Sequence, residues 1–353
     1  MNDTPPKGRG TGQAPDSRFL DWQREATDDG WPADTTDAPP RTQLQVDAAR
    51  TIITTNRSPD VPFDRSINPY RGCEHGCVYC FARPSHAWLG LSPGLDFETR
   101  LAWKPDAAVL LRKELAAPGY RCAPIALGVN TDAYQPVERR LGITREILKV
   151  LAECRHPVQI ITKSALIERD LDILGPMARD GLAQVMVSIT TLTTDLARTL
   201  EPRAAAPHRR LQTVRALAEA GIPVGVLFAP LIPALNDGEM DAVLAEAVAR
   251  GARTAGYVLL RLPLEVAPLF ERWLADHAPG RAAHVMSLVR QLRGGRANDP
   301  RFGHRMRGAG PFAEVYRQRF ALACKRLGIA PRHVALDSTR FVAPGSDIQG
   351  RLF

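Results

Sequence analysis

The chain has 353 residues, of which 44% are hydrophobic and 24% are charged, and its formal net charge is +8. This composition is typical of a globular protein with a sizeable core, and the length fits one large α/β unit or two ordinary domains. No uncharged apolar run approaches the roughly 18 residues of a membrane-spanning helix, and the opening MNDTPPKGRGTGQAPDS lacks the apolar core of a signal peptide. Six cysteines in so long a chain do not resemble a secreted disulfide framework. We therefore expect a cytoplasmic protein that makes no contact with a membrane.

The first part of the chain, residues 1–60, is rich in Pro, Gly, Thr, Asp and Arg and carries only short apolar fragments. Such a segment buries too little apolar surface to fold by itself. We expect an N-terminal arm that is largely disordered or loosely docked.

The next segment contains three closely spaced cysteines. The stretch SINPYRGCEHGCVYCFARPSHAW places Cys73, Cys77 and Cys80 as C-x3-C-x2-C. A closed [4Fe–4S] cluster is held by four thiolates, so three cysteines leave one iron open to a substrate, which points to catalysis. The alternative is a structural zinc site with His75 or His86 as fourth ligand, although neither histidine gives the usual paired spacing.

After the cysteines, short apolar runs rich in β-branched residues alternate with amphipathic stretches. Strands are expected at 124–129, 157–162, 183–189, 222–229 and 255–262, and helices at 143–154, 166–180, 208–221, 237–251 and 264–278. Strands this apolar predict a parallel sheet buried on both faces. A short strand before Cys73 makes six β/α units, too few for a closed eightfold barrel. The count leaves an open doubly wound sheet or a partial barrel, and the lack of G-x-G-x-x-G after a strand argues against a dinucleotide-binding fold.

Polar residues recur where the predicted strands end. They are Asn130, Thr131, Asp132 and Glu138 after the first long strand, Lys163 after the second, Ser188 in the third with Arg203 further on, and Arg261 at the end of the last. In parallel α/β proteins the chemistry sits at the carboxyl ends of the strands. We expect these side chains to gather beside the cysteines, with Asn130, Glu138, Arg203 and Arg261 as candidates for substrate binding.

The C-terminal region, 281–353, is basic and is predicted to contain one helix, at 312–328. Its segment RQLRGGRANDPRFGHRMR, from Arg290 to Arg307, has six arginines and one acid. Such a segment is either a solvated, mobile loop or a clamp for phosphate or carboxylate, which arginine binds in a bidentate way. The second interpretation makes Arg305 and Arg307 candidates for substrate binding, and the sequence pI of 9.4 favours an anionic partner such as nucleic acid.

The cysteine motif after a short strand of a β/α repeat, with Tyr79 beside the last cysteine, resembles the radical S-adenosylmethionine superfamily. Further segments are similar in order and spacing to those of spore photoproduct lyase and its DNA-photolyase-like relatives: TKS (162–164), VMVSITTLT (185–193), LEPR (200–203) and AGIPVGVLFAPLIP (220–233). The resemblance covers residues 65–262. It implies a partial (β/α)6 barrel of the TIM type over residues 61–280, between the N-terminal arm and the C-terminal extension.

The resemblance also implies a cofactor chemistry. Cys73, Cys77 and Cys80 would bind three irons of a [4Fe–4S] cluster, and the fourth iron would bind S-adenosylmethionine. Reductive cleavage would release a 5′-deoxyadenosyl radical that abstracts a substrate hydrogen, with a low-potential donor such as flavodoxin or ferredoxin supplying the electron. The positions implied to hold S-adenosylmethionine are Tyr79, Thr131, Asp132, Lys163 and Ser188.

Two positions depart from spore photoproduct lyase. Asn130 stands where that enzyme has its hydrogen-donating cysteine, and Phe81 stands where it has a relay tyrosine. We therefore expect a radical enzyme that does not repeat thymine-dimer reversal, with a nucleic acid as the favoured substrate and no hydrogen donor identified. The alternatives are a radical enzyme that modifies RNA, a peptide or a small metabolite, and a non-catalytic, metal-stabilised nucleic-acid-binding protein.

Overall fold

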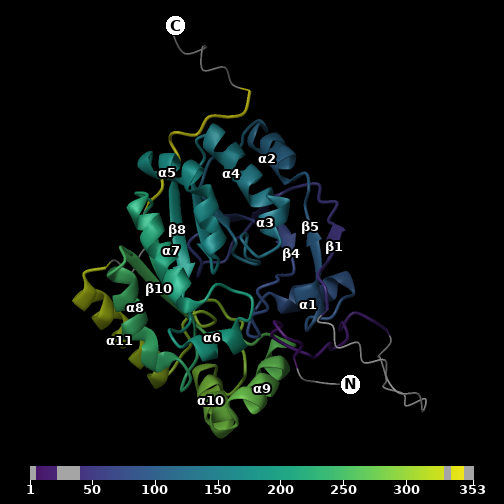
Figure 1. The fold of residues 1–353 in the computed structure, drawn as a ribbon, viewed down its shortest axis with the longest axis vertical. Coiled ribbons are helices and arrows are strands. Elements are labelled where there is room, and N and C mark those ends of the chain that lie inside the picture. The colour runs from purple at the N-terminus through teal and green to yellow at the C-terminus, as the bar shows by residue number, and fades with distance from the viewer. Residues whose placement is uncertain (1–4, 22–39, 330–334, 346–353) are drawn as a thin grey trace.

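The computed structural model describes residues 5–21, 40–329 and 335–345 (Figure 1). Its main sheet has seven strands in the order β10-β9-β8-β7-β6-β3-β2. Their bounds are β2 Ile53–Thr55, β3 Arg65–Ile67, β6 Ile125–Leu127, β7 Val158–Thr162, β8 Ala183–Ser188, β9 Val224–Leu231 and β10 Thr254–Leu259. Strands β3 and β6 to β10 are parallel, and β2 pairs with β3 in the antiparallel direction.

The six parallel strands are the six predicted β/α units. Within the described residues β10 and β2 are the two edges of the sheet and do not pair, so the sheet stays open. The α/β fold class with a partial barrel of the TIM type is therefore confirmed, and no closed barrel forms.

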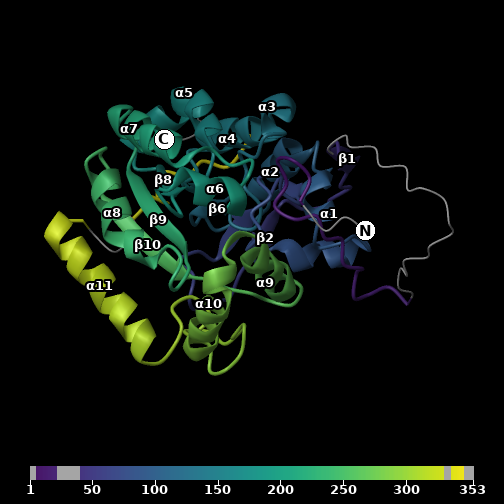
Figure 2. The same ribbon diagram turned by 60° about the horizontal axis from the view of Figure 1, so that its bottom comes forward.

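Helices cover the outer side of this sheet (Figure 2). They are α4 (Ile143–Glu153), α5 (Leu171–Arg179), α7 (Pro207–Glu219) and α8 (Met240–Val248). All six residues of β8 are buried, as expected of a strand covered on both faces. In α4 the predicted apolar face is confirmed, because Ile147, Leu148 and Leu151 are fully buried.

Shorter elements join and flank these units. The remaining helices of the main body are α1 (Asp96–Thr99), α2 (Ala107–Leu115), α3 (Glu138–Leu141), α6 (Thr194–Leu200) and α9 (Val266–His277), with 3-10 turns η1 (Arg83–Leu89), η2 (Ala165–Asp170) and η3 (Asp237–Glu239). A small second sheet has the order β1-β5-β4, with bounds β1 Gln43–Val46, β5 Arg100–Trp103 and β4 Tyr70–Arg71. Among the described residues, no helix is both long enough and apolar enough to cross a membrane.

In the described part of the C-terminal region there are two helices, so the expectation of one helix was wrong. Helix α10 (Pro279–Leu292) packs beside α9, and α11 (Pro311–Leu327) packs against α8 (Figures 1 and 2). The Pro-Gly pair that argues against a helix at the start of α10 lies in its first turn, where proline needs no hydrogen-bond partner. Val285, Met286 and Val289 then form its buried face.

The described parts of the N-terminal arm are docked more closely than expected. Arg9, Thr11 and Ser17 are buried, and Ser17 donates to the carbonyl of Ala87, with 2.8 Å between oxygens. Phe19 lies against Trp88, with 4.1 Å between ring centroids. Polar contacts therefore help to hold in place an arm that contains few apolar residues. Residues 1–4 and 22–39 of the arm lie outside the described residues.

Candidate functional site

The cysteine loop follows β4 and leads into η1. Cys73 and Cys77 are buried, Cys80 is half-buried, and none of the three forms a disulfide. Burial raises the pKa of Cys73 well above its ordinary value, and the nearby Asp132, Cys77 and Cys80 raise it further. Burial, with Glu201 and Cys80, likewise raises the pKa of Cys77 to about 12. The three thiols therefore lie within electrostatic reach of one another on this loop.

A buried ion pair fixes the backbone of the loop. Arg83 Nη2 lies 2.5 Å from Glu98 Oε1, and both side chains are fully buried. The same guanidinium donates to the carbonyls of Cys77, at 2.9 Å, and Gly76, at 3.2 Å. The free carboxylate oxygen of Glu98 accepts from the Gly10 N–H at 2.9 Å, so the N-terminal arm closes over the loop.

The donor set fits a cluster better than a single ion. Among the described residues, no three His, Cys, Asp or Glu side chains are arranged to hold one metal ion. His75 Nδ1 lies 3.4 Å from Asp132 Oδ2, and His86 Nε2 bonds the carbonyl of Arg100 at 2.8 Å. Each of these histidines uses one ring nitrogen for a protein partner, and the Nδ1 of His86 is buried without a hydrogen bond to any described residue. The thiolates around an iron–sulfur cluster bind different irons, so they need not converge on one point.

Lys163 lies at the carboxyl end of β7 and reaches across to β8 and β9. Its Nζ donates to Ser188 Oγ at 2.7 Å and to the carbonyl of Ala229 at 3.2 Å. The same Nζ lies 3.1 Å from Glu201 Oε1 and 5.8 Å from the ring centroid of Tyr79. Three residues predicted to hold the cofactor, Tyr79, Lys163 and Ser188, are thereby brought together beside the cysteine loop.

Glu201 is the centre of this group, although it was not among the predicted site residues. It is buried, it forms an ion pair with the buried Arg210, and it accepts from the Tyr79 hydroxyl and from Thr190 Oγ1. Burial opposes its ionisation, but Arg210 and Lys163 outweigh burial and hold the pKa of Glu201 well below its usual range. The LEPR segment, which resembles a family segment, is the feature of the sequence that could have pointed to Glu201. Its Glu201 and Arg203 are close enough in sequence to pair, but Arg203 pairs with Glu74, at 3.2 Å.

Asp132 orients the neighbouring loops. Its carboxylate accepts from Thr162 Oγ1 at 2.8 Å and from the Lys163 N–H at 2.7 Å. Thr131 Oγ1 donates to the carbonyl of Tyr70 at 2.8 Å, which ties the loop after β6 to the strand before the cysteines. Both residues therefore lie at the carboxyl ends of the strands, as expected, and their polar atoms already have protein partners.

The candidates for substrate binding are spread more widely. Glu138 is fully buried and bonds Tyr70, Arg169 and the Thr144 N–H, so its placement corrects the expectation that it faces a substrate. The sequence alone does not reveal that Glu138 is buried while Asn130 is exposed, because both residues follow the same strand, β6.

Five of the six arginines of the basic segment have partners among the described residues, and Arg293 is one of them, since it donates to the carbonyl of Leu260 at 2.6 Å. Arg305 pairs with Asp60 at 2.5 Å, and the Arg307 guanidinium lies 4.4 Å from the ring centroid of Tyr257. Arg290 pairs with Glu271 at 2.9 Å, and Arg301 with Asp299 at 2.7 Å. In the described residues this segment is a folded connection between α10 and α11 and not a free basic loop.

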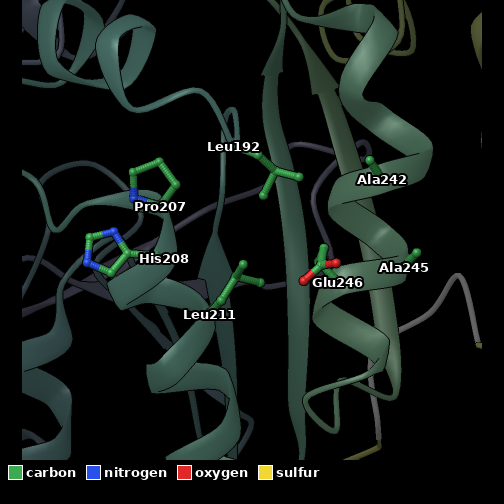
Figure 3. Close-up of a pocket in the computed structure, with 7 residues that line it drawn as sticks. All are labelled: Leu192, Pro207, His208, Leu211, Ala242, Ala245 and Glu246. Carbon is green, nitrogen blue, oxygen red and sulfur yellow. The ribbon is translucent and has the colours of Figure 1, made fainter.

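A separate groove of about 340 Å³ lies between α7 and α8, outside the sheet (Figure 3). It is lined by Leu192, Pro207, His208, Leu211, Ala242, Ala245 and Glu246. None of these residues belongs to the cysteine loop or to the Lys163 group, which consists of Tyr79, Lys163, Ser188 and Glu201, so the groove is not the candidate site.

Comparison with known proteins places this arrangement in a family. Residues 67–247, more than half of the chain, match the model of the Radical SAM superfamily. The chain is 37% identical to the uncharacterized protein Rv2578c of Mycobacterium tuberculosis over 233 residues, which is 65% of this chain and 68% of that protein. It is 29% identical to the uncharacterized protein MJ0683 of Methanocaldococcus jannaschii over 173 residues, 49% of this chain and 62% of that protein.

Among solved structures, the fold resembles that of spore photoproduct lyase complexed with dinucleoside spore photoproduct. The TM-score is 0.55 at 15% sequence identity, over 80% of this chain and 79% of that one. At this identity the likeness concerns the fold alone. The family match over the cysteine loop and the following strands decides the assignment: the chain belongs to the radical S-adenosylmethionine superfamily.

Proposed function

We propose that the chain is an enzyme in which Cys73, Cys77 and Cys80 hold a [4Fe–4S] cluster and in which the Lys163 group binds S-adenosylmethionine. The observation that carries the proposal is the position of Lys163. Its ammonium lies at the carboxyl ends of the strands, beside Tyr79, the residue that precedes Cys80. A cation at this place suits the carboxylate of the methionine part, because lysine acts as a compact point charge.

When bound, the cluster and S-adenosylmethionine supply one-electron cleavage of the cofactor, giving methionine and a 5′-deoxyadenosyl radical that takes a hydrogen atom from the substrate. The chain's own residues bind and orient. Lys163 and Ser188 would hold the methionine part, and Tyr79, whose ring centroid lies 5.8 Å from Lys163 Nζ, would flank the cofactor. Glu201 keeps the Lys163 ammonium aimed into the site, at 3.1 Å from its carboxylate. Arg83 and Glu98 hold the cysteine loop in place.

For the substrate we favour a nucleic acid. Support comes from the fold shared with spore photoproduct lyase and from the net charge of +8. Asn130 and Phe81 make the reaction differ from that of spore photoproduct lyase. A radical modification of RNA, a peptide or a small metabolite is the second candidate, and Asn130 favours it, because no hydrogen-donating cysteine stands there.

The same chemistry needs an external electron source. We propose as partner a small low-potential protein, such as a flavodoxin or a ferredoxin, that passes one electron to the oxidised cluster.

The test is an anaerobic reconstitution with iron and sulfide, followed by reduction and addition of S-adenosylmethionine. Iron, sulfide and 5′-deoxyadenosine are measured for the parent, for a variant with Cys73→Ala, Cys77→Ala and Cys80→Ala, and for Cys122→Ala as the matched control. Cys122 is half-exposed and lies outside the cysteine loop. We expect product from the parent and the control and none from the triple variant. One equivalent of zinc without product would instead support the metal-stabilised binding protein.

A further inference from the structure

Arg261 is a partly buried cation without an acidic partner. It directly follows Leu260, just beyond the end of β10, and its Nε is buried without a hydrogen-bond partner. Its Nη1 lies 3.8 Å from Met306 Sδ, a weak acceptor, and no carboxylate among the described residues bonds it. A guanidinium nitrogen that is held away from water without an oxygen partner costs free energy unless a ligand supplies one.

The charges around Arg261 are predominantly positive. Arg293 is buried and donates to four backbone carbonyls, those of Leu259, Leu260, His304 and Arg305. Burial, and then the charge of Arg261, lowers the pKa of Arg293 to about 10. Burial also lowers the pKa of Arg261, followed by the charge of Arg305, while Asp60 partly offsets both. Because Asp60 is already paired with Arg305, the group carries excess positive charge.

Phe81 completes the arrangement. The Arg261 guanidinium lies over its ring, 4.8 Å from the centroid, and Phe81 is 40% exposed. Phe81 is the residue directly after Cys80, so this pair lies at the edge of the cysteine loop. A guanidinium held over an aromatic ring loses freedom of movement, and a restrained fork of donors suits the bidentate binding of a phosphate.

We propose that Arg261, held by Phe81, binds a phosphate group of the substrate at the mouth of the site. The inference rests on the proposed function, since the cysteine loop must be the place of reaction for this position to be a substrate subsite. It deepens that proposal by naming the group that is recognised and the residue that recognises it. The phosphate belongs either to a nucleic acid strand or to a small phosphorylated compound, and the experiment separates the two.

The experiment uses the full chain after anaerobic reconstitution, in calorimetric titrations at fixed salt concentration, because phosphate contacts depend on salt. The probes are thymidine, thymidine 5′-monophosphate and a short single-stranded DNA oligonucleotide. For Arg261→Gln we expect an affinity loss of about tenfold or more for the two phosphate-bearing probes, typical of a lost charge-assisted hydrogen bond, and no change for thymidine. Arg261→Lys keeps the positive charge but not the two parallel N–H donors, so its affinity for these probes should lie between those of the parent and of Arg261→Gln.

Arg290→Gln is the matched control, because it removes the same charge from an arginine that is paired with Glu271 at the surface. It should leave all affinities within about twofold of the parent, since exposed pairs contribute little. Tighter binding of the oligonucleotide than of the mononucleotide by the parent would identify a nucleic acid strand, and equal binding would identify a small phosphorylated compound. The inference is overturned by equal losses in both variants, by a parent that binds no phosphate probe, or by an equal loss of S-adenosylmethionine binding in Arg261→Gln.

Failure of this inference and failure of the proposed function give different results. Formation of 5′-deoxyadenosine needs no phosphate ligand, so a parent that cleaves the cofactor while Arg261→Gln binds phosphate normally refutes the subsite alone. Phosphate binding that depends on Arg261 in a protein that never cleaves the cofactor refutes the enzyme and the substrate role of the phosphate, and leaves Arg261 as a phosphate-binding residue.

Discussion

Lys163 and Glu201 lie 3.1 Å apart at the carboxyl ends of the strands, and Glu201 is fully buried while Lys163 is only partly so. The two cations share the Glu201 carboxylate: Arg210 pairs with Oε2, and Lys163 lies beside Oε1. This relationship holds the Lys163 ammonium in place beside Ser188 and Ala229, with a carboxylate partner already bound. It also makes the stability of the site depend on one buried carboxylate.

Substitution of Glu201 by glutamine removes that carboxylate and leaves Arg210 buried without its counter-charge. We expect the free energy of unfolding to fall by about 3–5 kcal/mol, the usual cost of breaking a buried pair from one side. Urea unfolding followed by circular dichroism measures this change. Glu219→Gln removes the partner of Arg215 in an exposed pair and should cost under about 1 kcal/mol. Similar costs for the two variants would show that the Glu201 pair is not a structural anchor.

Substitution of Lys163 by methionine keeps the length of the side chain and removes its charge. We expect the reconstituted protein to lose about tenfold or more of its affinity for S-adenosylmethionine, because a charge-assisted contact to a carboxylate is lost. Equilibrium dialysis gives this affinity without any need for turnover. Lys149→Met, at an exposed lysine paired with Glu146, is the control and should bind as the parent does. An unchanged affinity in Lys163→Met would exclude the residue from the cofactor site.

Substitution of Gly10 by alanine tests the contact between the N-terminal arm and the cysteine loop. The new Cβ would lie 1.8 Å from the carbonyl oxygen of Gly76, so the arm must move away. We expect faster proteolytic cleavage of residues 5–21, less iron retained after reconstitution, and a stability loss of about 1–3 kcal/mol, as for other overpacked sites. Gly280→Ala, where a Cβ meets nothing within 4 Å, is the control. Parent-like cleavage and iron content in Gly10→Ala would show that the arm does not support the loop.

His156 should make the protein less stable in mild acid. Burial lowers the pKa of His156 from 6.5 to about 4, while its Nε2 lies 2.8 Å from the Tyr120 hydroxyl. Because the folded pKa is below the unfolded one, the unfolded chain binds the proton first, and stability is lost as the pH falls from 6.5 toward 4. Between pH 7 and pH 5 this one residue should account for about 2 kcal/mol of lost stability.

Unfolding in urea at the two pH values, for the parent and for His156→Gln, measures this share. The variant should lose about 2 kcal/mol less than the parent over the same interval, whereas the exposed His284→Gln should lose as much as the parent. Equal losses in the parent and in His156→Gln would mean that the histidine is not buried in its neutral form.

The two departures from the expected architecture have separate causes. Helix α10 starts with Pro279 and Gly280, which discourage a helix in general but are harmless in its first turn. The arm is poor in apolar residues, yet Arg9 and Gly10 bond Glu98, a partner far along the chain. Composition measures only how much apolar surface a segment can bury, so it misses docking that depends on a few polar contacts.

By itself the sequence determined the order of the β/α units, the open parallel sheet and the cysteine loop, because apolar periodicity and cysteine spacing are local properties of a chain. It also determined that Lys163 and Ser188 lie at one edge, since the carboxyl ends of parallel strands meet there. Only the tertiary structure decided that Glu201 pairs with Arg210, that Glu138 is buried, and that Arg261 has no carboxylate partner among the described residues. Pairing between charges depends on distances across the fold, and no local pattern of residues encodes those distances.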